Sequence, residues 1–238
     1  MQMKHEDILK EIFKEDPELY NELIVINNQL KEKINNDKKP ILIEFSGSAR
    51  SGKTSVIKSI AEVLRKYDNN VEVIDEEFFK ITKDINKNSK KKKEINSLDY
   101  TKELIKQKID TYDYAKKLEA DIIFWDRGIN DEFNWLKTFG EKDCKFYDKK
   151  LGKRKVDLLI MQVCDVMTSL KRKYGNSLYI KPNKWTNYEV CSAYLKAVDE
   201  NSNYFDKHAN NIFTIDTSDL KIIEASIIII KEIFKILY

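Results

Sequence analysis

Residues 47–54 read Gly47-Ser48-Ala49-Arg50-Ser51-Gly52-Lys53-Thr54. They follow an apolar run with strand character at residues 41–45, and apolar residues at helical spacing continue from Lys53 to residue 66. A GxxxxGKT pattern between a strand and a helix is typical of a P-loop, whose backbone N–H groups and helix N-terminus bind phosphates. The sequence therefore predicts that this turn binds the triphosphate of ATP or GTP.

The chemistry of a P-loop gives roles to individual side chains. Lys53 is expected to reach the β- and γ-phosphates, and the hydroxyl of Thr54 is expected to help hold Mg²⁺. The nucleotide-binding residues predicted from this stretch are Gly47, Ser48, Ala49, Arg50, Ser51, Gly52, Lys53, Thr54 and Ser55.

Strand-like and helix-like segments alternate along the rest of the chain. Further strands are expected at residues 71–74, 121–125, 156–163 and 212–215, and helices at 53–66, 98–118, 129–139, 186–205 and 220–237. Strands separated by helices form βαβ units around a buried parallel sheet. The predicted fold is therefore α/β: a three-layer P-loop NTPase fold with a mainly parallel five-stranded sheet flanked by helices.

Two parts of the chain differ in pattern. Residues 1–39 lack strand signals and show apolar residues at helical spacing, and Pro40 then disfavours helix at the residue before it. We expect an N-terminal helical extension at residues 1–39 and a P-loop domain at residues 40–238, with a lid region at about 165–185.

An Asp-Arg pair, Asp126 and Arg127, follows the strand expected at 121–125. Ligands of parallel α/β sheets bind beyond the carboxyl ends of the strands. Asp126 is therefore predicted to order Mg²⁺, and Arg127 to bridge the donor phosphate and the acceptor. The alternative for such a dipeptide is a surface ion pair.

Three acidic residues, Asp75, Glu76 and Glu77, follow the strand expected at 71–74. A hydroxyl acceptor benefits from a nearby carboxylate that orients it and takes its proton. Asp75 is the first residue past the strand and is the predicted base, with Glu76 next. A solvated acidic turn is an equally good interpretation.

A basic segment follows the strand expected at 156–163, with Lys171, Arg172 and Lys173 at its centre. Such a segment could close over the phosphates as a lid, excluding water and supplying charge. Arg172 is the predicted catalytic residue among them. A solvated helix face is the competing interpretation.

Composition limits the class of protein. The net charge of +3, from 43 Lys and Arg against 40 Asp and Glu, gives no overall nucleic-acid footprint. The dense run Lys90–Lys93 is interpreted as a solvated loop. No segment stays apolar for the roughly 20 residues of a membrane span, and the charged N-terminus does not resemble a secretory signal.

The three cysteines, Cys144, Cys164 and Cys191, are odd in number and form no CxxC pair. Neither a disulfide framework nor a zinc site is expected from this pattern. A reducing, cytoplasmic location fits the cysteine usage.

From about Pro40 onward the chain resembles the thymidylate kinase and deoxynucleoside kinase branch of the P-loop kinases. The resemblance rests on the P-loop, the Asp126-Arg127 pair, the Arg172 region and the final strand with its following loop, residues 213–218. It implies a five-stranded parallel sheet, a possible homodimer, and a loop of Asp216, Thr217 and Ser218 that borders the adenine of ATP.

Two departures from the thymidylate kinase pattern bear on the acceptor. Arg50 matches an Arg of that loop, but Ala49 stands where an Asp engages the acceptor sugar, and acids at residues 75–77 replace an Arg that holds the acceptor monophosphate. Carboxylates would repel a phosphorylated acceptor and suit an uncharged hydroxyl.

The hypothesis is in-line transfer of the γ-phosphate from Mg·ATP to a nucleoside or another small hydroxyl compound, with Lys53 and Arg50 on the donor. Thr54 and Asp126 would hold the metal, Asp75 would act as base, and Arg127 and Arg172 would contact the transferring group. Three alternatives stay open: a nucleoside monophosphate kinase, an NTP-binding regulatory ATPase, and a polynucleotide 5′-hydroxyl kinase.

Overall fold

The computed structural model of this protein describes residues 14, 18 and 25 and the ranges 40–66, 69–75, 97–141, 145–175 and 187–237. In the N-terminal segment, Lys14, Glu18 and Val25 are helical. Glu76, Glu77, the Lys90–Lys93 run, Cys144 and the part of the expected lid at 176–186 lie outside the described residues.

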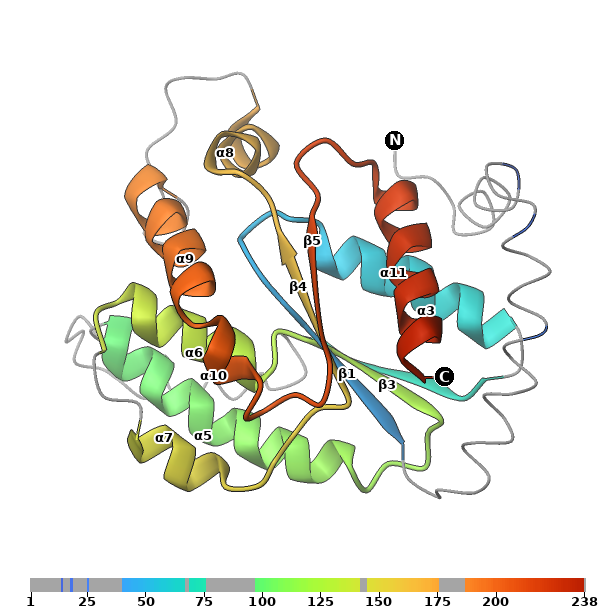
Figure 1. The fold of residues 1–238 in the computed structure, drawn as a ribbon, viewed down its shortest axis with the longest axis horizontal. Helices are drawn as coiled ribbons and strands as arrows, with labels where there is room; N and C mark the ends of the chain where they lie inside the picture. The colour runs from blue at the N-terminus through green and yellow to red at the C-terminus, as the bar shows by residue number, and fades with distance from the viewer. Residues whose placement is uncertain are drawn as a thin grey trace, which may run out of the picture.

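A five-stranded sheet forms the centre of the molecule (Figure 1). Its strands are β1 (Ile41–Ser46), β2 (Val71–Ile74), β3 (Ile122–Asp126), β4 (Leu158–Val163) and β5 (Ile212–Asp216), in the order β2-β3-β1-β4-β5. Every pairing between neighbouring strands is parallel. The predicted parallel five-stranded α/β fold is confirmed.

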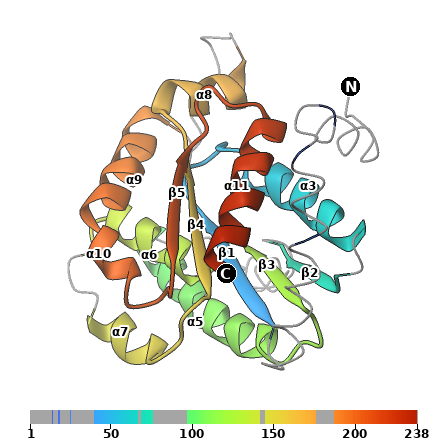
Figure 2. The same ribbon diagram turned by 45° about the vertical axis from the view of Figure 1, so that its right-hand side comes forward.

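Helices cover both faces of the sheet, as Figures 1 and 2 show from two directions. One face carries α3 (Lys53–Lys66) and α11 (Ile222–Leu237), and the other carries α5 (Ser97–Ala115), α6 (Ile129–Thr138) and α9 (Tyr188–Glu200). Alternate residues of β1 explain the two layers, because Ile43 and Phe45 pack toward α3 and α11, whereas Leu42 packs toward α6 and α9.

Three short helices complete the described chain: α7 (Lys145–Leu151), α8 (Val166–Tyr174) and α10 (Ser202–Phe205). The helix expected at 186–205 is two helices, because the Asn201 side chain donates to the carbonyl of Ala197 and ends α9. The strand expected from residue 156 begins at Leu158, since Val156 forms only an isolated bridge with Ala209. The sequence did not predict α7.

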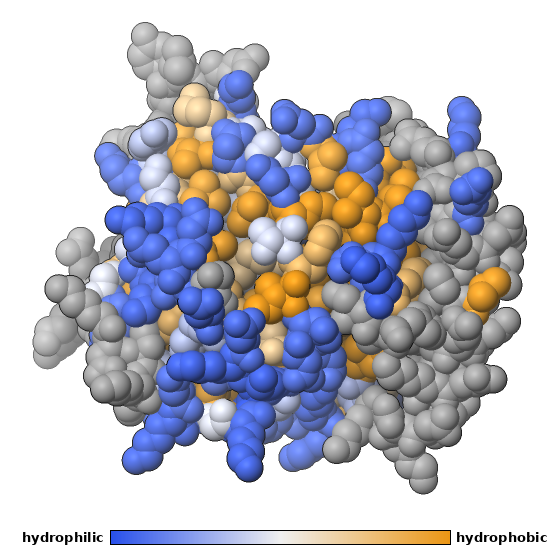
Figure 3. All heavy atoms as spheres, in the orientation of Figure 1, coloured by the Kyte–Doolittle hydropathy of each residue, from blue (hydrophilic) through white to orange (hydrophobic). Residues whose placement is uncertain are grey.

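The surface in Figure 3 is divided by polarity, with apolar side chains over β5 and α11 and hydrophilic side chains over the lower part of the view. β5 lies at one edge of the sheet, and Met167 and Ile222 near its carboxyl end are 54% and 48% exposed. Within the described ranges, no helix has both the length and the hydropathy to cross a membrane.

Candidate active site

The register of the sheet brings the predicted site residues to one edge. Phe45 of β1 pairs with Asp126 of β3, and Ile74 of β2 pairs with Trp125, so Asp75 follows β2 beside Asp126. On the other side of β1, Val163 of β4 pairs with Asp216. The carboxyl ends of all five strands therefore meet where α3 begins, as the parallel topology requires.

The P-loop is shaped by a glycine that no other residue could replace. Gly47 has φ +134°, and a Cβ placed on it would lie 1.8 Å from the carbonyl oxygen of Gln162 on β4. The Gln162 side chain also donates to the carbonyl of Ser51 at 2.6 Å. Both ends of the loop thus contact β4. At the start of α3, the Gly52 carbonyl accepts hydrogen bonds from the N–H groups of Ser55 and Val56.

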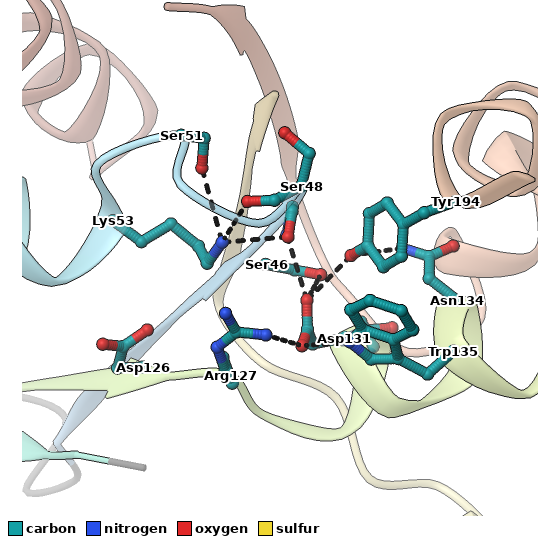
Figure 4. Close-up of polar contacts among 12 residues, drawn as sticks. Ser46, Ser48, Ser51, Lys53, Asp126, Arg127, Asp131, Asn134, Trp135 and Tyr194 are labelled. Carbon is teal, nitrogen blue, oxygen red and sulfur yellow. Dashed lines mark hydrogen bonds and ion pairs between the residues drawn. The ribbon is translucent and has the colours of Figure 1, made fainter. Parts of the chain in front are cut away.

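The Lys53 ammonium lies inside the loop (Figure 4). It is 4% exposed and donates to the carbonyls of Gly47 at 2.9 Å and Ser48 at 2.8 Å, and to the Ser51 hydroxyl at 3.3 Å. The lysine therefore stands at the centre of the turn, at the position from which a P-loop lysine contacts phosphates.

Thr54 and Asp126 form a pair at the start of α3. The Thr54 hydroxyl donates to Asp126 Oδ2 at 2.5 Å, and Asp126 is 2% exposed. Its other oxygen, Oδ1, is buried and accepts no hydrogen bond from the described residues. Such an oxygen fits a cation ligand, and Mg²⁺ in phosphate-transfer sites is held by one or two carboxylates with substrate phosphates and water. Among the described residues, no group of three or more His, Cys, Asp or Glu side chains could hold a metal ion. A magnesium ion at Asp126 would therefore need further ligands from substrate phosphates or water.

Arg127 has an unusual backbone that turns its side chain toward the P-loop. Its φ is +61°, its N–H donates to the Phe45 carbonyl at 2.9 Å, and its own carbonyl accepts a hydrogen bond from the buried Lys108 of α5. Both contacts hold the left-handed turn that a side chain normally disfavours. In Figure 4 the guanidinium extends toward Lys53, with Nη1 3.4 Å from Asp131 Oδ2.

Asp131 of α6 is a site residue that the sequence did not reveal. It is 0% exposed and accepts five hydrogen bonds, from the Ser46 hydroxyl, the Gly47 N–H, Arg127, the Trp135 indole and the Tyr194 hydroxyl. Burial acts to raise the pKa of this carboxyl, but the charges of Arg127 and Lys53 and these hydrogen bonds lower it below its usual range. Asp131 is therefore a buried carboxylate anion.

Glu44 lies beside it in the middle of β1. It is 0% exposed and accepts hydrogen bonds from the Asn130 N–H at 2.8 Å, the Asn130 side chain at 2.9 Å and the Asp131 N–H at 3.1 Å. Burial raises its pKa from 4.5 to about 7, against the lowering effect of these hydrogen bonds. A Cβ at Gly128 would lie 2.5 Å from the Glu44 carboxyl carbon, so glycine lets the start of α6 approach it. The sequence did not predict Glu44, although an acidic residue inside an otherwise apolar strand is a signal that could have found it.

Arg172 of α8 joins the P-loop to the loop after β5. Its Nη1 donates to the carbonyl of Arg50 at 3.2 Å, and Nη2 donates to the carbonyls of Thr217 at 2.6 Å and Ser218 at 3.3 Å. The Thr217 hydroxyl in turn donates to the carbonyl of Ser51 at 2.9 Å. The predicted adenine loop, Asp216 to Ser218, therefore lies against the P-loop, and a phosphate contact of Arg172 stays a prediction.

The remaining predicted residues are placed as follows. Asp75 is exposed at the end of β2, on the side of Asp126 away from β1. Cys164 and Cys191 are buried free thiols, and burial raises the pKa of each. The structure thus groups the P-loop, Asp126, Arg127 and the loop at 216–218, with Asp75 at the β2 side of this group.

Comparisons with known proteins give one partial family match. The family model described as chromatin associated protein KTI12 matches residues 41–115, which run from β1 to the end of α5. No curated protein sequence matches this chain.

Solved structures match most of the chain. A thymidylate kinase from Ehrlichia chaffeensis has a TM-score of 0.55 at 18% identity, covering 82% of this chain and 98% of that chain. Two structures of a deoxyadenosine kinase from M. mycoides, one with the products dCMP and a flexible dCDP and one with dATP, each have a TM-score of 0.51 at 19% identity. They cover 82% of this chain and 98% and 99% of their own. This chain therefore has the fold of these P-loop kinases.

Proposed function

We propose that this chain, which shares its fold with a thymidylate kinase and a deoxyadenosine kinase, transfers the γ-phosphoryl group of Mg·ATP to a hydroxyl of a nucleoside-like small molecule. We further propose that the P-loop domain spans residues 40–238, that the N-terminal helices are an appendage, and that the protein acts in the cytoplasm, where ATP is abundant.

The observation that carries the proposal is the Thr54–Asp126 pair. A hydroxyl at the start of a P-loop helix is hydrogen-bonded to a buried carboxylate whose second oxygen has no donor among the described residues. The Lys53 ammonium lies inside the adjacent loop. This combination supports a site for a triphosphate with its magnesium ion better than it supports a purely structural turn.

The residues would divide the chemistry between binding and charge stabilisation. Lys53, Arg50 and the loop amides would bind the donor phosphates, and Mg²⁺ held by Thr54 and Asp126 would neutralise the charge on the β- and γ-phosphates. Arg127 would contact the transferring group. Arg172 could join it only by exchanging its carbonyl contacts for phosphate.

Transfer would proceed by in-line displacement. The acceptor hydroxyl oxygen bonds to the γ-phosphorus, the bond from that phosphorus to the β–γ bridging oxygen breaks, and ADP leaves. Asp75 would take the hydroxyl proton. An acidic sequence at 75–77 favours an uncharged hydroxyl over a monophosphate, which supports a nucleoside-like acceptor.

The test is a panel of nucleosides, nucleoside monophosphates, sugars and short oligonucleotides incubated with γ-labelled ATP. We expect label on a nucleoside or a related small hydroxyl compound. K53M should lower that transfer by about 100-fold or more, since the loss of one preorganised charge donor typically costs this much. D75N should lower transfer without weakening Mg·ATP binding. Faster labelling of a monophosphate or an oligonucleotide than of every nucleoside would contradict the proposed acceptor class.

A second candidate is an NTP-binding protein that regulates a macromolecular partner. The match to the chromatin associated protein KTI12 model over residues 41–115 favours it, since those residues include the P-loop. This candidate predicts slow ATP hydrolysis that no small acceptor accelerates. The same panel therefore separates the two functions.

A further inference from the structure

Asp131 links three parts of the molecule through one carboxylate. Oδ1 accepts the Ser46 hydroxyl and the Gly47 N–H, each at 3.1 Å, and the Tyr194 hydroxyl of α9 at 2.8 Å. Oδ2 accepts the Trp135 indole at 3.2 Å and Arg127 Nη1 at 3.4 Å. The first amide of the P-loop and the guanidinium of Arg127 are thus held by the same rigid group.

Stability alone is a weak reason for this arrangement. Removing a carboxylate and its partner from water costs several kcal/mol, and well-packed apolar side chains often replace a buried ion pair without loss. The anion at 131 therefore calls for an explanation in terms of what it holds in place.

The Arg127 contact has the geometry of an orienting interaction. The Arg127 backbone is fixed by its N–H on Phe45 and its carbonyl on Lys108, and its side chain is 21% exposed. A planar guanidinium carries five N–H donors, so a contact of Nη1 with a carboxylate is compatible with a phosphate on another edge. Figure 4 shows Arg127 between Asp131 and the Lys53 ammonium.

We propose that Asp131 is a positioning residue that orients the Arg127 guanidinium toward the γ-phosphate and fixes its place relative to the first P-loop amide. This inference rests on the proposed function. Asp131 touches neither nucleotide nor acceptor, and it acts through Arg127.

The test is a double-mutant cycle measured by nucleotide binding, with Mg·ATP and Mg·ADP as probes. The readout is the ratio of the two dissociation constants, which isolates contacts to the γ-phosphate. R127A should reduce the preference for ATP by about ten-fold, the size of one charge-assisted contact. D131N should reduce it by a similar factor, and R127A/D131N should reduce it no further, because the second change removes an effect already lost.

D157N is the matched control. Asp157 also accepts a β1 amide, that of Leu42 at 2.8 Å, and a cation, Lys116 at 2.8 Å, but it lies at the opposite end of the strand. D157N should lower stability while leaving the ATP:ADP ratio unchanged. A similar loss of the ratio in D157N would mean that the effect of D131N is only structural, which would overturn the proposal.

An independent measurement covers the case in which D131N does not fold. The Trp135 indole N–H shares Oδ2 with Arg127, so its NMR resonance, assigned with W135F, should move more with Mg·ATP than with Mg·ADP. In R127A the two nucleotides should give the same displacement. An ATP-specific displacement that persists in R127A would overturn the proposal.

The outcomes also separate this inference from the proposed function. Failure of the wild-type protein to bind Mg·ATP would overturn both. Normal binding with additive losses in R127A/D131N would overturn the role of Asp131 alone.

Discussion

Glu44 and Asp131 are adjacent buried carboxyls whose environments move their pKa values in opposite directions. Glu44 has burial as its dominant influence and titrates near neutral pH, while Asp131 faces Arg127 and Lys53 and stays ionised at lower pH. One of the two can thus carry its proton while the other holds a charge, which limits repulsion between them. This division makes the start of α6 sensitive to pH.

We predict that Glu44 gives the wild-type protein a stability that falls as pH rises. The pKa of Glu44 is raised from 4.5 to about 7 on folding, so the folded state holds the proton more tightly than the unfolded state does. The stability that this difference contributes is complete below pH 4.5 and is lost as the pH rises through 7. The shift corresponds to about 3 kcal/mol. The difference in unfolding free energy between wild type and E44Q, measured in urea from pH 5 to 8, should change by about 2.5 kcal/mol, because part of the loss occurs below pH 5. A constant difference across that range would contradict the raised pKa.

Gly47 gives a prediction about steric fit. In G47A the new Cβ would meet the Gln162 carbonyl oxygen at 1.8 Å, so the P-loop would have to leave β4. We expect a loss of more than about 3 kcal/mol in unfolding free energy. G140A is the matched control, because Gly140 also has a positive φ, +89°, but no heavy atom lies within 4 Å of its Cβ. It should cost only the strain of that backbone, about 1–2 kcal/mol.

Sequence could identify the residues that a motif contains but not those that support it. Lys53, Thr54 and Asp126 were predicted because spacing and position after a strand carry their chemistry. Asp131 and Lys108 meet Arg127 only through the packing of α6 and α5 on the sheet. Helical spacing predicts which face of a helix a residue lies on, but it does not predict which residue of another helix or strand that side chain contacts.

At the scale of elements, α8 holds two loops that come from distant parts of the chain. Asp165 caps α8 by accepting the Thr168 N–H at 2.9 Å, and hydrogen bonds from the Thr168 side chain and then its backbone are the main causes that lower the pKa of Asp165 to about 2. The Asp165 N–H donates to the Ser218 hydroxyl at 2.9 Å. The helix therefore begins on the loop after β5 and reaches Arg50 through Arg172.

We predict that R172A loosens the loop after β5. Its guanidinium donates to the carbonyls of Arg50, Thr217 and Ser218, and charged hydrogen bonds of this kind contribute about 1.5–3 kcal/mol. The Thr217 amide should exchange its hydrogen roughly 10- to 100-fold faster in R172A. K171A, an exposed neighbour on the same helix, is the control. Equal protection of Thr217 in wild type and R172A would show that these contacts do not hold the loop.

The bounds of helices and strands were predicted well where the period of apolar residues and the length of the segment indicated the same type of element. The helix at 53–66 and the strand at 71–74 have the observed bounds, because a P-loop and short β-branched runs mark their ends. The α9–α10 break was missed because apolar spacing continues through Asn201, whose side chain ends the helix by a local hydrogen bond. The seven residues of α7 were missed, since so short a helix gives little periodic signal.

At the scale of the whole molecule, the proposed nucleotide site couples ligand binding to the stability of the fold. Lys53 and the Thr54–Asp126 pair, the proposed metal site, lie at one edge of the sheet. A ligand that binds only the folded state stabilises it by mass action. Nucleotide binding should therefore appear as a change in global stability.

We predict that Mg·ATP at about 100 times its dissociation constant raises the Tm by about 5–10 °C, which follows from about 2.7 kcal/mol of linkage in a chain of this size. EDTA should reduce the rise, and T54A or D126N should reduce it even with Mg²⁺ present. Differential scanning fluorimetry measures each effect. An increase in Tm that is the same with EDTA and in both variants would contradict a metal site at Thr54 and Asp126.

The hydrogen bond from Thr217 to Ser51 spans 166 positions of the chain. A ribosome therefore synthesises the P-loop long before it releases the strand and loop that contact it. Because contacts so distant in sequence form slowly, the nascent chain should acquire nucleotide affinity only after its last strand has left the exit tunnel.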